Sequence, residues 1–162
     1  MPIKILILYY SKTGNTEKMA KAVAEGASMV NDVKVLIKSV REARLQDLLE
    51  ADGIIIGSPT YYGTIAGPLK EFLDQTVKYH GSLEGKVGGA FASCGARGGG
   101  VETTVLDLIK IMLIHGMIVQ GNPEEHHYGV ISIGSPDEET LTACKELGRR
   151  VAVLAKKLKS TS

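Results

Sequence analysis

The sequence predicts one α/β domain over residues 1–162, in which helices cover both faces of a five-stranded parallel sheet. Short apolar runs alternate with longer segments of helical periodicity, the pattern of repeated strand–helix–strand units. The runs Ile5–Leu8 and Ile54–Ile56 are continuously apolar, as strands buried on both faces are. Lysines interrupt Val33–Ile37, which favours an edge strand. An edge second strand and an interior first strand give the order 2-1-3-4-5.

In the first half of the chain each predicted strand is followed by a predicted helix. Residues 16–29 carry apolar side chains at helical spacing, and Arg44–Glu50 predicts a short helix before the third strand. We expect that strand to end at Gly57-Ser58-Pro59. Pro68 suits the first turn of the next helix. The expected buried face of that helix is Leu69, Phe72, Leu73 and Val77.

The second half continues the alternation. Val87–Ser93 predicts a strand of small residues and Val101–Leu113 a strongly apolar helix. Met117–Val119 begins the fifth strand, which Val130–Ile133 resumes after a polar excursion. The run Ser135-Pro136-Asp137-Glu138 predicts a capping box with proline at the first helical position. The residues expected to be buried by the final helix are Leu141, Cys144, Leu147, Val151, Leu154 and Leu158.

Composition limits the classes of partner. With 19 basic and 18 acidic residues the formal net charge is +1, which argues against a nucleic-acid partner. No apolar run approaches the roughly 20 residues that cross a bilayer, and the N-terminus lacks a signal-peptide profile. Cys94 and Cys144 have neither metal-site nor disulfide-framework spacing. We therefore expect a cytoplasmic protein with no membrane partner and no metal.

The stretch "YYSKTGNT" at residues 9–16 predicts a phosphate site. Its hydroxyls and amide follow a strand and precede a helix, where backbone N–H groups are also free. It has neither the Walker spacing nor a G-x-G-x-x-G pattern. An ordinary helix cap is the alternative, but a cap needs only one or two such residues. The residues that supply these donors are Ser11, Thr13, Asn15 and Thr16.

Two further loops belong to the same edge of the predicted sheet, since the carboxyl ends of parallel strands meet there. Residues 58–67 carry adjacent tyrosines, which either cover a flat ligand or close the edge of the core. Residues 93–100 are rich in glycine, which permits close backbone approach to a ligand; a loop without a partner is the alternative. Together the loops predict a site for a flat heterocycle with a terminal phosphate.

These motifs resemble a known family. "YSKTGNT" resembles the FMN phosphate loop of the flavodoxin superfamily. "GSPTYYGTIAGPLKEFLDQT" and "FASCGARGGGVETT", followed by "HGM" and later "YG", resemble its WrbA-type NAD(P)H:quinone oxidoreductase branch. The similarity covers nearly the whole chain in order. It implies a flavodoxin-like three-layer α/β/α fold with FMN as cofactor.

The resemblance also implies which residues bind FMN. The phosphate would be held by Ser11, Thr13, Gly14, Asn15 and Thr16. The isoalloxazine would be lined by Pro59, Thr60, Tyr61, Tyr62 and Gly63, with Tyr62 as the stacking aromatic. The ring edge and ribityl chain would be approached by Ser93, Cys94, Gly95, Arg97, Gly98 and Gly99. Cys94 could be redox-active there, but tight packing of a small residue is the favoured interpretation.

The predicted activity is two-electron reduction of a small quinone-like acceptor by NAD(P)H, with ping-pong hydride transfer through flavin N5. Candidates for a proton donor to the acceptor are Tyr61, His80, His115, His127 and Tyr128. For His115 the alternative is a charge at a helix C-terminus. A flavodoxin-type electron carrier and an FMN-binding regulatory module without turnover are the alternatives for the whole protein.

The chain departs from the family at two places that bear on acceptor and assembly. It is shorter than typical members of the branch, chiefly between residues 120 and 140. Before the fourth strand it offers only Tyr79 and His80 where the family usually has a tryptophan. A homodimer or homotetramer is implied by the resemblance alone.

Overall fold

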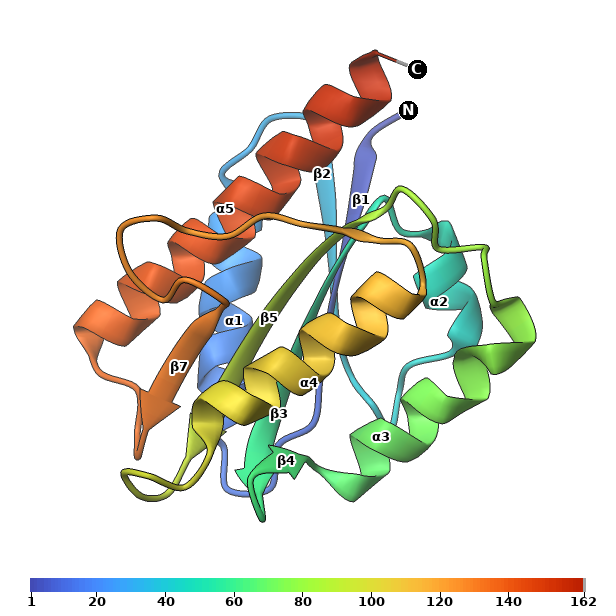
Figure 1. Ribbon diagram of the computed structural model, residues 1–162. Coiled ribbons are helices and arrows are strands. Elements are labelled where there is room, and N and C mark those ends of the chain that lie inside the picture. Colours follow the sequence, from blue (N-terminus) through green and yellow to red (C-terminus); the bar gives the residue numbers. More distant parts are fainter. Residues whose placement is uncertain (162) are drawn as a thin grey trace.

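A twisted parallel sheet runs through the middle of the computed structural model, which describes residues 1–161 (Figure 1). The order is β2-β1-β3-β5-β6; β7 also pairs with β5, and β4 pairs antiparallel with β3. The strands are β1 Ile3–Tyr9, β2 Val33–Ser39, β3 Gly53–Tyr61, β4 Thr64–Ile65, β5 Val87–Cys94, β6 Ile118–Val119 and β7 Val130–Ile133. The helices are α1 Asn15–Ser28, α2 Leu45–Glu50, α3 Gly67–Asp74, α4 Val101–Ile114 and α5 Glu138–Ser160.

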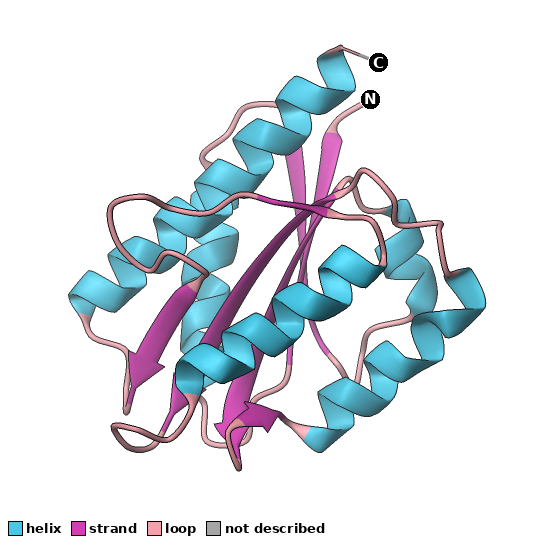
Figure 2. Cartoon of the chain, viewed as in Figure 1, coloured by secondary structure: helices cyan, strands magenta, loops and turns pink. Residues whose placement is uncertain are grey.

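Helices cover both faces of the sheet, as Figure 2 shows. Successive side chains of a strand point to opposite faces, so β1 sends Leu6 and Leu8 into the core under α2, α3 and α4. Ile5 and Ile7 enter the other core, under α1 and α5. The predicted three-layer flavodoxin-like fold is thereby confirmed.

The helices α1 and α5 touch at glycines. A Cβ at Gly148 would lie 2.0 Å from the carbonyl oxygen of Val23, and one at Gly26 would lie 1.8 Å from that of Lys145. Because no side chain fits at these positions, the two backbones pack directly against each other. The pair forms the layer on one face of the sheet.

The fifth strand position is occupied by two separate pieces, as predicted. β6 pairs with Val87 and Gly88, whereas β7 pairs with residues Phe91 to Cys94 further along β5. The segment 120–129 leaves the sheet between them and returns. The predicted order 2-1-3-4-5 therefore corresponds to β2, β1, β3, β5 and the interrupted strand β6/β7.

The prediction that the third strand ends at Gly57-Ser58-Pro59 is wrong. β5 pairs with β3 as far as Pro59, which lies opposite Ser93, and β3 continues to Tyr61 because Thr60 and Tyr61 pair antiparallel with β4. The chain then turns back into β4. This hairpin carries the adjacent tyrosines past the edge of the parallel sheet.

Two helix predictions also need correction. Val77 is 74% exposed, because α3 ends at Asp74 and a 3₁₀ helix, η1 (Gln75–Tyr79), follows it. With three residues per turn, Thr76 takes the inward position above Leu73. The last helix begins at Glu138, so Pro136 lies outside it. Its N-cap is Asp137, whose carboxylate accepts a hydrogen bond from the N–H of Thr140.

No helix among residues 1–161 combines the length and the apolar character that crossing a membrane requires.

Candidate functional site

Three loops meet at the carboxyl edge of the sheet, at the bottom of Figure 1. They comprise residues 9–16 (first loop), 58–67 (second loop) and 93–100 (third loop). Adjacent pairing of β1, β3 and β5 places their ends side by side. Cross-loop contacts join them: the hydroxyl oxygens of Thr16 and Ser93 lie 2.8 Å apart. The predicted meeting of the three loops is what the structure shows.

In the first loop, α1 starts without a side-chain cap among the described residues. Its N-cap, Gly14, has φ = 99°, a left-handed conformation that favours glycine. The N–H of Gly14 donates to the Ser11 hydroxyl at 3.2 Å, and the Thr13 side chain is exposed. Uncapped N–H groups at the positive end of a helix form an anion site.

Thr16 does not face solvent with the other residues of the first loop. It is buried, with its hydroxyl directed to Ser93. We therefore place Thr16 and Ser93 as the pair that fixes the first loop against the third. Direct contact of both residues with FMN stays a prediction.

The second loop is built around two tyrosines. Tyr62 is fully exposed and has φ = 50°, an uncommon conformation for a bulky residue. Tyr61 is more than a third exposed, yet burial of its hydroxyl end and the neighbouring Tyr10 raise the pKa of its phenol. A phenol with its ordinary pKa near 10 is already protonated at neutral pH, and the rise in pKa preserves this, so Tyr61 can donate a hydrogen bond.

Ser58 is a supporting residue that sequence reasoning missed. Its side chain is buried, accepts a hydrogen bond from the N–H of Ala66 at 3.0 Å and donates one to the carbonyl of Pro59 at 2.8 Å. It thus ties together the two ends of the second loop. The sequence signal that could have identified Ser58 was its position directly before Pro59, where the third strand was predicted to end.

The hydroxyl oxygen of Thr60 is buried and has no hydrogen-bond partner within residues 1–161. A buried polar atom without a partner costs about 1–3 kcal/mol. Thr60 lies next to Tyr61 at the end of β3, where the loops meet. This unsatisfied group is what a site completed by a polar ligand presents.

In the third loop, glycine allows the backbone to lie close to the backbone of the second loop. A Cβ at Gly100, where φ is 90°, would lie 2.7 Å from Cα of Gly63. The hydroxyl of Thr103 lies 2.6 Å from the Gly63 carbonyl oxygen. A Cβ at Gly99 would lie 2.3 Å from the Cys94 sulfur, so glycine at this position leaves room for that sulfur. Gly95, Arg97 and Gly98 are exposed.

His80 and His115 lie away from these loops. His115 follows the last residue of α4, and its Nε2 lies 2.8 Å from the hydroxyl of Thr76, just beyond α3. The rings of His80 and His115 are 6.0 Å apart. Helices α3 and α4 both start at the carboxyl edge of the sheet and end at the opposite edge (Figure 1). Within one chain neither imidazole belongs to the site.

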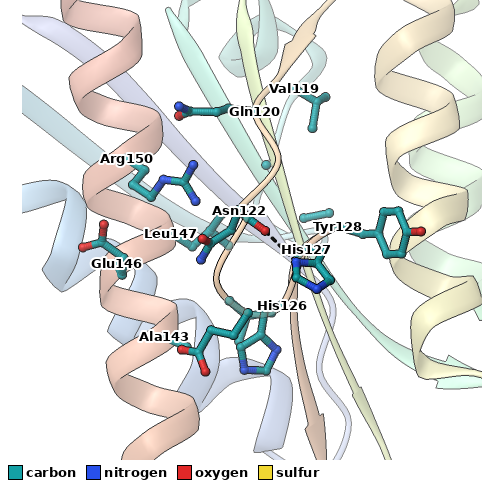
Figure 3. A pocket seen from close by; sticks show the side chains of 15 residues that line it. Val119, Gln120, Asn122, His126, His127, Tyr128, Ala143, Glu146, Leu147 and Arg150 are labelled. Carbon is teal, nitrogen blue, oxygen red and sulfur yellow. Dashed lines mark hydrogen bonds between the residues drawn. The ribbon is translucent and has the colours of Figure 1, made fainter.

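His127 and Tyr128 lie in the segment 120–129 at the side of the sheet. Together with Glu102, in the first turn of α4, they line a cavity of about 230 Å³. In Figure 3 Tyr128 points toward α4, away from His126 and α5. His127 lies 2.7 Å from the carbonyl oxygen of Asn122 through Nδ1. These residues flank the third loop rather than forming part of it.

A smaller cavity of about 40 Å³ lies on the other side of this segment, against α5 (Figure 3). Arg150 borders it and donates to the carbonyl of Gly121 at 2.7 Å. Among the residues that the structure describes, no group of three or more His, Cys, Asp or Glu side chains is arranged to hold a metal ion.

The residues of the three loops fit FMN. The uncapped start of α1 suits a phosphate, the exposed ring of Tyr62 offers a flat face, and the unsatisfied Thr60 hydroxyl offers a polar partner. No carboxylate belongs to the first loop, whose charged residue is Lys12, so no negative side chain of this loop opposes an anion.

Comparison with known proteins gives one family. Residues 37–125 match the model of the NADPH-dependent FMN reductase family. A flavodoxin from Aquifex aeolicus is 39% identical over 157 residues, covering 92% of this chain and 85% of the relative. An NAD(P)H dehydrogenase (quinone) from Archaeoglobus fulgidus is 36% identical over 189 residues, covering 96% of this chain and 98% of the relative.

Solved structures agree. A flavodoxin, WrbA-like protein from Agrobacterium tumefaciens superposes with a TM-score of 0.81 at 26% identity, covering 96% of this chain and 98% of that one. An archaeal flavodoxin gives a TM-score of 0.80 at 31% identity, covering 95% and 99%. The predicted family and FMN as its cofactor are confirmed. The chain belongs to the NADPH-dependent FMN reductase family, as a flavodoxin-like, WrbA-type FMN oxidoreductase.

Proposed function

We propose that this protein is an FMN-dependent NAD(P)H:quinone reductase. The observation that carries the proposal is the convergence at one sheet edge of an uncapped helix N-terminus, an exposed strained tyrosine and an unsatisfied buried hydroxyl. The quinone dehydrogenase at 36% identity, matched over nearly its whole length, supports the reaction class. The proposed reaction converts NAD(P)H, a proton and a quinone into NAD(P)⁺ and a hydroquinone.

When bound, FMN would supply two-electron hydride chemistry between the nicotinamide and the acceptor. The chain positions it: Thr13 and the first N–H groups of α1 hold the phosphate, and Tyr62 covers one face of the ring. The hydroxyl of Thr60, which has no partner within residues 1–161, would be available to donate a hydrogen bond to the bound cofactor. Tyr61, which like any phenol is protonated at neutral pH, donates a hydrogen bond to the acceptor oxygen.

A one-electron carrier is the second candidate, favoured by the flavodoxin relative at 39% identity. Carriers that dock on basic partners use an acidic surface, which speeds their encounter. The balance of 18 acidic and 19 basic residues supports the reductase instead.

An anaerobic titration tests the proposal. The FMN-loaded protein is mixed with NADH or with NADPH, and the flavin absorbance is followed by stopped flow. Rapid bleaching that a benzoquinone reverses, with one hydroquinone formed per reduced nicotinamide, supports the reductase. Flavin that stays oxidised with both nucleotides but exchanges single electrons with a ferredoxin-type donor supports the carrier.

A Tyr61→Phe variant tests the role of the Tyr61 hydroxyl toward the acceptor independently of FMN binding. It retains the ring, so we expect unchanged FMN affinity and unchanged bleaching by the nicotinamide. Reoxidation by the quinone is expected to slow about 3- to 10-fold, the effect of one lost hydrogen bond. Equal reoxidation rates for both proteins would remove Tyr61 from the proposal while leaving the reductase assignment intact.

A further inference from the structure

A two-residue turn carries the exposed ring of Tyr62. β3 and β4 pair with Tyr61 opposite Thr64, so Tyr62 and Gly63 form the turn between the two strands. Both residues have a left-handed backbone, with φ of 50° and 74°, as the tightest hairpin turns require. β4 has only two residues, and a two-stranded hairpin by itself is marginally stable in water. The position of the Tyr62 ring therefore depends on what holds this turn.

The first half of α4 holds the turn through two hydrogen bonds. The hydroxyl of Thr103 donates to the carbonyl oxygen of Gly63 at 2.6 Å. The hydroxyl of Thr64, the residue after the turn, donates to the Asp107 carboxylate at 2.6 Å. Thr103 and Asp107 are four residues apart, so they lie on the same face of the helix. In Figure 1 this part of α4 lies beside β4, and the two bonds join the helix to the turn at neighbouring points.

The single hydroxyl hydrogen of Thr103 has two carbonyl oxygens within reach. One belongs to Gly63, and the other, at 2.7 Å, belongs to Gly100 of the third loop. The Gly100 carbonyl also accepts from the N–H of Thr104 at 3.1 Å, so it keeps a hydrogen bond when the Thr103 hydrogen points to Gly63. The Thr103 hydroxyl can therefore bind the turn without leaving the start of α4 unsatisfied.

The backbone of the turn, and not the side chain of Tyr62, sets where the ring lies. The ring is fully exposed, so packing of the side chain does not fix it. The backbone is close-packed, since a Cβ at Gly100 would lie 2.7 Å from Cα of Gly63. The two hydrogen bonds to α4 and this close contact together fix the turn, and the ring follows the turn.

We propose that Thr103 and Asp107 are positioning residues for the flavin, because they hold the turn so that the Tyr62 ring lies flat against the isoalloxazine. Neither residue touches the cofactor in this proposal; each acts through the turn. A bond that fixes a loop in its binding conformation raises affinity, since less conformational freedom is lost on binding. The proposal rests on the proposed role of Tyr62 in covering one face of the flavin, and it does not depend on the identity of the electron acceptor.

Fluorescence titrations of the FMN-free protein with FMN and with riboflavin test this. Thr103→Val removes the hydroxyl and keeps the shape of the side chain. We expect it to bind both flavins about 2- to 10-fold more weakly, and to lose no more affinity than Tyr62→Gly does. The losses for the two flavins should be equal, because they share the ring and differ in the phosphate. Thr103→Ser, which keeps the hydroxyl, should restore most of the affinity.

A double-mutant cycle with Tyr62 separates positioning from a general effect on the fold. If Thr103 acts through the ring, Thr103→Val should have no further effect on flavin affinity in a Tyr62→Gly background. A merely structural role would give the same loss with and without the ring. Asp107→Ala is expected to behave in the same way as Thr103→Val.

Lys110→Gln is the matched control on the same helix. It removes the ion pair of Lys110 with Asp107, at 2.6 Å, and leaves the hydrogen bond from Thr64 to that carboxylate in place. We therefore expect unchanged affinity for both flavins in this variant.

Three results would overturn the proposal. One is unchanged affinity for both flavins in Thr103→Val and in Asp107→Ala. Another is a loss that persists in full without the Tyr62 ring. The third is a loss for FMN alone, which would place the effect at the phosphate. Normal flavin binding by Tyr62→Gly would also overturn it, through the stacking role on which it rests. None of these titrations involves a quinone, so their outcome is independent of the reductase assignment.

Discussion

Tyr62 combines a left-handed backbone with a fully exposed ring, and the chain alone gives no compensation for either. The conformation costs an L-residue about 1–2 kcal/mol, and a flavin ring stacked on Tyr62 would contribute about 0.5–1.5 kcal/mol beyond area burial. Tyr62→Gly is expected to leave the FMN-free protein at least as stable and to weaken FMN binding about 3- to 10-fold, measured by fluorescence titration. Tyr62→Phe, which keeps the ring, should bind normally. Unchanged affinity in the glycine variant would contradict the stacking role.

Thr13 is the exposed hydroxyl of the first loop. If it donates to the phosphate, Thr13→Ala removes a hydrogen bond to a charged group, which contributes about 1.5–3 kcal/mol. FMN affinity should fall about 10-fold or more, while riboflavin affinity should stay unchanged because riboflavin has no phosphate. Parallel calorimetric titrations with both flavins measure this. Equal losses for the two flavins would contradict the phosphate assignment.

Substitution of Thr16, in contrast to that of Thr13, is expected to change the free energy of unfolding. Thr16→Ala leaves the buried hydroxyl of Ser93 without its partner, at a cost of about 1–3 kcal/mol in the free energy of unfolding. Urea unfolding of the FMN-free protein measures this cost. The double variant Thr16→Ala with Ser93→Ala should recover part of the loss, since no hydroxyl is then left unpaired. A double variant less stable than the sum of the single changes would contradict the pairing.

The direction in which a side chain points was the part of the site that the sequence could not predict. Thr13 and Thr16 belong to one motif, yet one is exposed and the other is buried against the third loop. The difference arises because α1 starts between them, so Thr16 already follows the helical path toward the sheet. Residue type predicted the donors, and tertiary packing decided which of them face a ligand.

At the scale of elements, the predictions failed where pairing or helix type changed. Apolar runs predicted the strands of the core because those strands are buried on both faces. The extension of β3 over Thr60 and Tyr61 depends on antiparallel pairing with β4, a two-residue strand that was not predicted from the sequence. Val77 was placed on a buried face because helical periodicity was extended past Asp74, where a 3₁₀ turn begins.

The start of α5 gives a direct test at this scale. Asp137 caps the helix by accepting from the N–H of Thr140 at 2.8 Å, and Asp137→Ala should lower the free energy of unfolding by about 1 kcal/mol. Ser135, the cap expected from the motif, is exposed and lies before the helix, so Ser135→Ala should be nearly neutral. Urea unfolding of both variants measures the two values. A larger loss for Ser135→Ala would restore the capping box predicted from sequence.

At the scale of the whole molecule, the sheet order followed from the pattern of apolar runs, and with it the edge where the loops meet. The distances between the candidate residues could not be predicted from this pattern. α4 is 14 residues long, so about 21 Å separates its ends, and it carries the chain from the third loop to His115 at the opposite edge. A list of histidines near the motifs in sequence therefore included two that the fold places far from the loops.

Global stability should depend on pH through His115. Burial, then His80, lower its pKa in the folded state below the unfolded value of about 6.5, so below that pH the unfolded chain binds more protons. The contribution of His115 to the free energy of unfolding is therefore fully present above about pH 6.5, and it is lost as the pH drops toward the pKa in the folded state. In His115→Gln, whose amide can still reach Thr76, the free energy of unfolding should fall less steeply between pH 7.5 and 5.5. Urea unfolding across this range measures both slopes, and carboxylates contribute equally to the two proteins. Parallel pH profiles would contradict a depressed pKa at His115.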